Sequence, residues 1–249
     1  MSLEVLLQTL CAGQLRLTRI DKFADPFEGS VPKQQIDDQL PLFSSRNMFF
    51  VSSGELDARP PLDPWTEMTL RRRAMTRSAH ASCWSAGHES EAMWRLYCND
   101  EGVQGQGVAV ESTLGTIEAS VEHLNLVVSP VRYRYYHEGA AFDDELDSFF
   151  HKRQGFAHEA EVRLLSYDQK QCLQFALAFN TGSAQPAELP DHLFLEWAAT
   201  AAVERLLISP YASQEYEERV KTAVAAIEPL LTGKVQLSVL SERRHAPQF

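Results

Sequence analysis

The alternation of hydrophobic and polar residues divides the chain into predicted helices and strands. Apolar residues recur at helical spacing over 3–10, Gly13 follows as a helix stop, and 15–20 then alternates like a half-buried strand. The same criteria predict helices at 65–78, 89–97, 114–123, 142–153 and 213–231. They predict strands at 79–84, 108–110, 126–135, 159–167, 172–179, 206–210 and 235–239, with 159–167 and 172–179 paired as a hairpin around Asp168.

This mixture of elements predicts the fold class and the domain organisation. We expect an α+β fold, in which a central mixed or antiparallel sheet is flanked by helices, and a single domain over residues 1–249. No internal repeat or linker divides the chain. Five prolines between 31 and 64 predict an irregular excursion with little regular sheet.

Composition and charge narrow the function classes. With 249 residues and 44% hydrophobic content, the chain can bury a substantial core. A net charge of -11 argues against broad adhesion to nucleic acid or anionic membrane. The N-terminus lacks the pattern of a secretory signal, and no apolar segment is long enough to span a bilayer. The four cysteines lack the close pairs of zinc or redox sites, so we expect reduced thiols, no metal and a cytoplasmic location.

One predicted strand carries an unusual number of charges. In a strand beginning at residue 159, the side chains of Glu159, Glu161 and Arg163 share one face, while apolar residues occupy the other. The polar face could therefore form a site beside the core. The alternative interpretation is an exposed face with a cross-strand ion pair.

The predicted helix at 65–78 is strongly basic although the protein is acidic. Its cationic residues are Arg71, Arg72, Arg73 and Arg77. This face could contact phosphate groups of a nucleotide or nucleic acid. Alternatively, the arginines pair with neighbouring carboxylates on a solvated helix.

Several segments, taken together, resemble a known family. They are 15–29 with its Asp-Pro-Phe-Glu-Gly stretch, 82–85, 89–97, 107–113, Lys152 with 156–163, and 207–210. In this order and over nearly the whole chain, they resemble the bacterial and phage domain-of-unknown-function family twenty-nine seventy-one. Many relatives have Asn before Asp-Pro-Phe and Trp before the Glu-x-Glu-x-Arg segment, where this chain has Ala24 and Phe156.

The resemblance implies a fold and a polar cleft without a settled activity. The cleft would be built from the loop 25–28, the region 82–94 and the segment 152–163. Its candidate residues are Asp25, Glu28, Trp84, Trp94, Lys152 and Arg163. For the charged members, buried ion pairing is the alternative to ligand contact.

A second similarity is to ADP-ribosyltransferases that use NAD. They have an arginine on an early strand, a Ser-Thr element after a middle strand and a Glu-x-Glu pair opening a later strand. Here Arg16 or Arg19 would bind the pyrophosphate, and Ser112 with Thr113 would form the middle element. The similarity implies that Glu161 holds the ribose hydroxyl and stabilises positive charge as nicotinamide leaves, while Glu159 orients the attacking group. A phage-defence or toxin setting would suit such an enzyme.

Other interpretations stay open at this stage. The pair Ser112 and Thr113 also fits a helix N-cap. A nuclease would need a carboxylate and lysine cluster, which Asp25, Glu28, Lys152, Glu159 and Glu161 could supply if the fold brought them together. A non-catalytic nucleotide or nucleic-acid binding module would use the arginine helix. Convergence of the early arginine, Ser112 and Glu161 in one cleft would favour the transferase.

Overall fold

The computed structural model describes residues 1–30, 64–100, 102–135 and 146–241. The chain divides into two compact units, each assembled from separate stretches of sequence. Unit 1 comprises Met1–Arg16, Ala86–Leu126 and Phe194–Phe249, and unit 2 comprises Leu17–Ser85 and Val127–Leu193. Organisation as a single domain stays a prediction. The predicted Pro-rich excursion lies outside the described residues, apart from Pro64 at the start of a helix.

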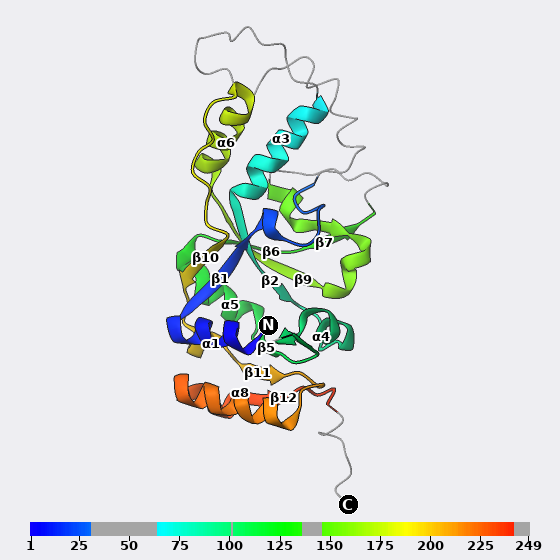
Figure 1. Ribbon diagram of the computed structural model, residues 1–249, viewed down its shortest axis with the longest axis vertical. Coiled ribbons are helices and arrows are strands. Elements are labelled where there is room, and N and C mark those ends of the chain that lie inside the picture. Colours follow the sequence, from blue (N-terminus) through cyan, green and yellow to red (C-terminus); the bar gives the residue numbers. More distant parts are fainter. Residues whose placement is uncertain (31–63, 101, 136–145, 242–249) are drawn as a thin grey trace, which may run out of the picture. The chain divides into compact units, whose positions relative to one another are not determined.

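Unit 1 combines a three-stranded sheet with several helices (Figure 1). The sheet has the order β12-β11-β5, in which β11 runs parallel to β12 and antiparallel to β5. The elements of unit 1 are α1 (Leu3–Ala12), α4 (Glu91–Tyr97), β3 (Asn99–Asp100), β4 (Val103–Gln104), β5 (Val108–Glu111), α5 (Leu114–Val121), η2 (Glu122–Leu124), α7 (Ala199–Ala202), β11 (Arg205–Ile208), α8 (Gln214–Ile227), η6 (Pro229–Lys234) and β12 (Val235–Leu237).

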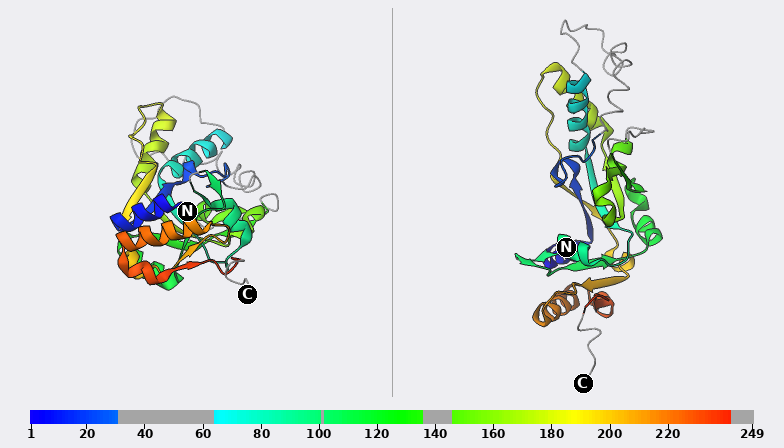
Figure 2. Two further views of the ribbon diagram at one scale, coloured as in Figure 1. Left: turned by 60° about the horizontal axis from the view of Figure 1, so that its bottom comes forward. Right: turned by 90° about the vertical axis from the view of Figure 1, so that its right-hand side faces the viewer.

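Side-chain caps and apolar stripes explain the two long helices of unit 1. The hydroxyl of Ser2 accepts a hydrogen bond from the Val5 amide at the start of α1, and Gly13 ends the helix at a φ of 57°. Ser213 caps α8 in the same way. Helix α1 packs against α8, as the left view of Figure 2 shows, and Leu6 and Val220 are buried on these helices.

Unit 2 is built on two long antiparallel strands and two helices. The elements are η1 (Ile20–Lys22), α3 (Pro64–Arg77), β2 (Ala79–Ser85), β6 (Val127–Pro130), β7 (Arg132–Arg134), η4 (Leu146–Phe150), β8 (His151–Arg153), η5 (Gln154–Glu159), β9 (Glu161–Tyr167) and α6 (Gln169–Thr181). Strand β9 pairs antiparallel with both β2 and β6. Helices α3 and α6 lie side by side in Figures 1 and 2 and contact each other.

The largest sheet has the order β10-β1-β2-β9-β6. Its strands β1 (Gln14–Arg19) and β10 (His192–Glu196) each begin in one unit and end in the other. The predicted α+β class with a central, mostly antiparallel sheet is confirmed. No helix among the described residues combines the length and apolarity needed to cross a bilayer.

The hydrophobic core of unit 2 lies where α3, α6 and the 3₁₀ helix η4 meet β2 and β9. Its buried members are Ile20, Ala74, Met75, Ala79, Ala81, Phe149, Phe150, Leu165, Cys172 and Phe175. Phe149 and Phe175 are fully buried and fill much of this volume. The core therefore anchors both η4 and β9, which carry parts of the site described below.

Two of the predicted elements are wrong. The segment 172–179 is not a strand of a hairpin but part of α6, whose N-cap is Asp168. Buried Cys172 and Phe175 are three residues apart, as one face of a helix requires. The predicted helix at 142–153 is a short 3₁₀ helix followed by strand β8 in its described part, because β8 pairs in parallel with β7. Residues 142–145 lie outside the described residues.

Candidate functional site

The charged segment at the start of β9 is buried rather than exposed. Strand β9 begins at Glu161, so Glu159 does not share its face by strand alternation as predicted; it lies in η5. The chain turns between them at Ala160, whose φ of 43° is left-handed. Glu159, Glu161 and Arg163 are 6%, 4% and 0% exposed. The interpretation as an exposed polar face is therefore wrong.

Arg163 is at the centre of this arrangement. Its Nη1 and Nη2 atoms donate to the Glu28 carboxylate over 2.8 and 2.9 Å. Its Nε and Nη2 atoms donate to Glu161 over 2.5 and 3.3 Å, and Nη1 also donates to the Phe149 carbonyl oxygen over 2.6 Å. All five N–H groups of the guanidinium thus have acceptors, which allows it to be fully buried.

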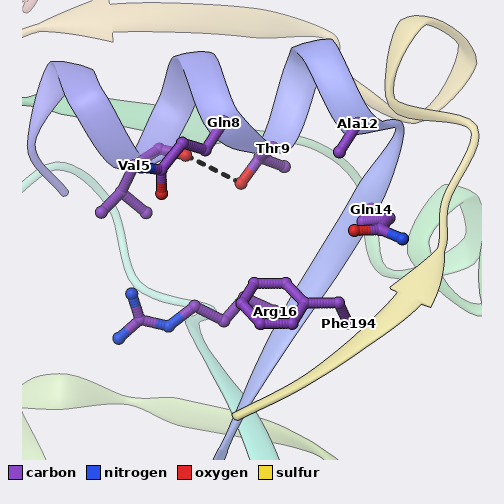
Figure 3. A pocket seen from close by; sticks show the side chains of 7 residues that line it. All are labelled: Val5, Gln8, Thr9, Ala12, Gln14, Arg16 and Phe194. Carbon is purple, nitrogen blue, oxygen red and sulfur yellow. Dashed lines mark hydrogen bonds between the residues drawn. The ribbon is translucent and has the colours of Figure 1, made fainter.

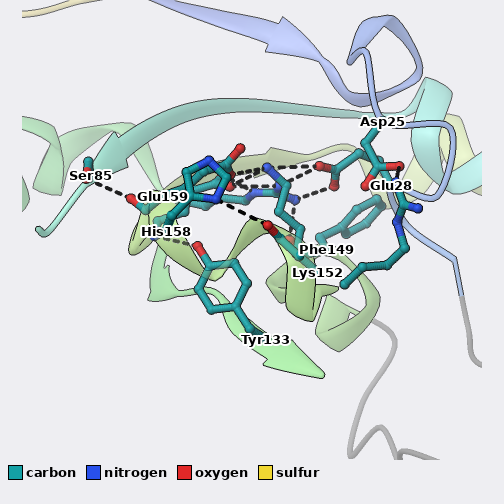
Figure 4. Close-up of polar contacts among 12 residues, drawn as sticks. Asp25, Glu28, Ser85, Tyr133, Phe149, Lys152, His158 and Glu159 are labelled. Atoms are coloured by element: carbon teal, nitrogen blue, oxygen red, sulfur yellow. Dashed lines mark hydrogen bonds and ion pairs between the residues drawn. The ribbon is translucent and has the colours of Figure 1, made fainter. Parts of the chain in front are cut away.

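Lys152 on β8 joins the remaining carboxylates. Its Nζ atom lies 2.6 Å from Glu159 Oε2, 2.8 Å from Glu161 Oε2 and 3.5 Å from Glu28 Oε1. We call Glu28, Lys152, Glu159, Glu161 and Arg163 the ion network (Figure 4). Three carboxylates and two cations leave the network with one excess formal negative charge.

The network favours the charged forms of Glu161 and Lys152. Burial alone would raise the pKa of Glu161, but Arg163 and Lys152 outweigh it and lower that pKa to about 2. Burial would likewise lower the pKa of Lys152, but Glu161, Glu159 and Glu28 raise it above its usual range. Glu161 and Lys152 are therefore both ionised at neutral pH.

Specific contacts hold the loop that carries Glu28. Gly29 follows at a φ of 65°, and a Cβ built there would lie 2.8 Å from Thr76 Cγ2. Arg72 on α3 donates to the Glu28 carbonyl oxygen over 2.9 Å. Arg153 Nη2 lies 2.8 Å from Asp25 Oδ1. The loop 25–29 is therefore held from α3 and from β8.

Strand β2 contributes two side chains that reach solvent beside the network. Cys83 and Ser85 lie directly opposite Arg163 and Glu161 in the β2–β9 ladder, and both are exposed. Desolvation by the surrounding protein atoms raises the pKa of the Cys83 thiol although the residue is partly open to solvent, and Glu161 raises it further against the influence of Arg163. Ser85 Oγ donates to the Glu159 carbonyl oxygen over 2.7 Å. Solvent thus reaches this face of β2 next to the buried charges.

The two early arginines have different environments. Arg19 is 1% exposed, and its guanidinium pairs with Asp21 at 2.7 Å and with Glu188 and Asp191 at 3.4 Å. These three carboxylate partners of the Arg19 guanidinium all belong to unit 2. Arg16 instead lies in unit 1 and lines a recess beside α1.

Other predicted site residues have local structural roles. Thr113 caps α5 by accepting from the Thr116 amide over 3.2 Å, and Ser112 Oγ donates to the Ala202 carbonyl oxygen over 2.6 Å. Trp94 is buried in unit 1, where it packs with Cys98 and Leu207. Because Ser112 and Glu161 belong to different units, the predicted transferase constellation stays a prediction.

The remaining candidates lie on β2 and α3. Trp84 lies on the face of β2 opposite to Cys83, because side chains alternate along a strand. On α3, Arg77 pairs with Glu188 at 3.2 Å, and Arg73 lies 5.3 Å from the centre of the Phe179 ring. Together with Arg72, these arginines make intramolecular contacts. Nucleic-acid binding by the set Arg71, Arg72, Arg73 and Arg77 stays a prediction.

Two residues of the site were missed from the sequence. The sequence predicts Cys83 only as one of four reduced thiols, whereas the pairing of β2 with β9 places it across from Arg163. The Tyr133 hydroxyl accepts from the Glu161 amide over 2.7 Å, and no local pattern indicated this contact.

Comparison with known proteins adds no assignment. No family model, curated protein or solved structure matches this chain. Both the family resemblance and the similarity to ADP-ribosyltransferases stay predictions. Among the residues that the structure covers, no group of three or more His, Cys, Asp and Glu side chains is arranged to hold a metal ion.

Proposed function

We propose that the protein cleaves the N-ribosyl bond of NAD at Glu159 and Glu161, as an ADP-ribosyltransferase or NAD glycohydrolase. The observation that supports this proposal is the excess negative charge of the buried ion network. A buried negative charge stabilises a positive charge that develops beside it. A reactant that becomes positively charged next to the network would therefore be stabilised.

Glu161 would stabilise that positive charge. As the bond between C1′ and the nicotinamide nitrogen breaks, its electron pair stays with the nitrogen, which becomes neutral. Positive charge then develops at C1′ and the ring oxygen of the ribose. A carboxylate with a pKa of about 2 stays ionised at neutral pH and lowers the energy of this state. Since the leaving group needs no proton, an ionised carboxylate is suited to this reaction.

Glu159 and Lys152 would serve the attacking group. Water, or a hydroxyl of a target molecule, adds to C1′ and gives up one proton, for which Glu159 is the acceptor. Lys152 lies within 2.8 Å of both carboxylates and fixes their separation. Ser85 and Cys83 mark the side from which solvent reaches them.

The experiment is to incubate the purified protein with NAD and to quantify released nicotinamide by chromatography. We expect release by the wild type and a loss of at least about 100-fold for Glu161→Gln, as for removal of one preorganised stabilising group. Glu118→Gln provides the matched control, because Glu118 is exposed on α5 in unit 1. Its rate should equal that of the wild type.

Unfolding of the variant must be distinguished from loss of chemistry. Circular dichroism checks each variant, and Glu161→Asp keeps the charge for Arg163 and Lys152 if Glu161→Gln does not fold. The aspartate variant should fold yet release nicotinamide far more slowly, because its side chain is one methylene shorter and holds the carboxylate farther from C1′. Absence of release by the wild type, or wild-type rates in folded Glu161 variants, would overturn the proposal.

A further inference from the structure

A recess of about 250 Å³ lies in unit 1 between α1 and the strands β1 and β10 (Figure 3). Its walls are formed by Val5, Gln8, Thr9, Ala12, Gln14, Arg16 and Phe194. Phe194 is 54% exposed and gives the recess an accessible aromatic surface. Two of its polar side chains are already engaged in α1: Gln8 Nε2 donates to Glu4 over 3.1 Å, and Thr9 Oγ1 donates to the Val5 carbonyl oxygen over 2.9 Å.

Arg16 is the charged group of this recess, and it has no ion-pair or hydrogen-bond partner among the described residues. Other arginines of unit 1 do have carboxylate partners. Arg95, with 62% of its side chain exposed, pairs with Glu91, and Arg205, with 44%, pairs with Glu111. In a protein with a net charge of -11, acidic partners are plentiful. A half-buried guanidinium without one is therefore a position at which an external anion would be stabilised.

We propose that this recess binds a small aromatic anion, such as a carboxylate or phosphate monoester attached to one ring. The Arg16 guanidinium would pair with the anionic group through two parallel hydrogen bonds, and the ring would lie against Phe194 and the apolar wall of Val5 and Ala12. The combination of the Arg16 guanidinium with an apolar wall selects against neutral aromatic molecules and against small inorganic anions.

The size of the recess limits the ligand. Pockets for drug-sized molecules usually measure about 300–1,000 Å³, so a volume of about 250 Å³ suits a single-ring compound rather than a dinucleotide. The inference is therefore independent of the NAD chemistry proposed for unit 2. Its failure would leave that proposal unaffected, and the reverse also holds.

The test is isothermal titration of the full chain with phenyl phosphate, benzoate and the neutral analogue benzamide. We expect at least one of the two anions to bind, benzamide to bind at least 10-fold more weakly, and inorganic phosphate to bind at least 10-fold more weakly than phenyl phosphate. Arg16→Gln should weaken binding of the anion at least 10-fold, and Arg16→Lys should retain part of it because the charge remains. Phe194→Ala should also weaken binding.

Arg95→Gln is the matched control, since it removes an exposed arginine of the same unit outside the recess. It should bind the anion as the wild type does. Binding of neither anion, equal binding of benzamide, or undiminished binding by Arg16→Gln would each overturn the inference.

Discussion

Replacement of Arg163 by methionine is the most direct test of the ion network. The methionine fills much of the same volume but removes five hydrogen bonds, two to Glu28, two to Glu161 and one to Phe149. Of its cationic partners in the described part of the chain, Glu28 would keep Lys152, whose Nζ atom is 3.5 Å away. Loss of one partner from a buried ion pair costs about 3–5 kcal/mol. We therefore expect the free energy of unfolding to fall by about that amount, a large part of a typical total of about 5–15 kcal/mol.

Urea unfolding followed by circular dichroism measures this change. Arg205→Met is the control, because Arg205 also lies on a strand and pairs with a carboxylate, Glu111, but is exposed to solvent. Screening by water should leave that variant without a resolvable change in stability. The double variant Arg163→Met/Glu28→Gln should recover part of the loss, since it removes a carboxylate left without its partner. Equal stabilities of Arg163→Met and Arg205→Met would refute the reasoning.

Three further predictions concern pH, backbone and thiol chemistry. Because the pKa of Glu161 is lowered from 4.5 to about 2 in the folded protein, the stability it contributes is complete above pH 4.5 and is lost as the pH falls toward 2. Urea titrations across this range should show a steep loss in the wild type and a shallower one in Glu161→Gln; parallel curves would contradict the assignment. Gly29→Ala should lower the free energy of unfolding by more than about 1 kcal/mol in urea, and by clearly more than the control Gly102→Ala. Both glycines have positive φ, but only at Gly29, of these two, would the added Cβ lie 2.8 Å from a side chain, that of Thr76. Equal losses would show that packing around Gly29 is unimportant. The exposed thiols Cys11 and Cys83 should react with a disulfide reagent before the buried thiols Cys98 and Cys172. Cys83 should react more slowly than Cys11 because the pKa of its thiol is raised, and comparison of the variants Cys11→Ser and Cys83→Ser measures the two rates. Equal rates at the two exposed thiols would contradict this prediction.

The amino-acid pattern predicted most of the regular elements because their apolar periodicity is strong. Strand β9 was identified by alternation, and α1 by its stripe and its stop at Gly13. The failure at 172–179 has a local cause, because the stretch contains no β-branched residue and its buried Cys172 and Phe175 follow helical spacing. Helix propensity therefore favours α6 over a strand in this stretch.

The composition of the candidate site was only partly accessible from the sequence. The partners Glu28 and Arg163 are separated by 135 positions, and no local pattern specifies such a contact. The difference in burial between Arg16 and Arg19, in contrast, can be predicted from the sequence. Arg19 shares the alternating face of β1 with buried Leu15 and Leu17, so burial with carboxylate partners was to be expected for it.

The interleaving of the two units has a consequence for synthesis on the ribosome. Helix α1 is made well before its packing partner α8, which begins only at Gln214. At a synthesis rate of about 5–20 residues per second, the roughly 200 residues between α1 and α8 take tens of seconds to be made. An isolated helix of 10 residues is marginal in water. The stretch 17–193, which contains all of unit 2, emerges during this interval. Unit 2 can therefore condense before unit 1, whose helix α1 gains its packing partner only when α8 has been made.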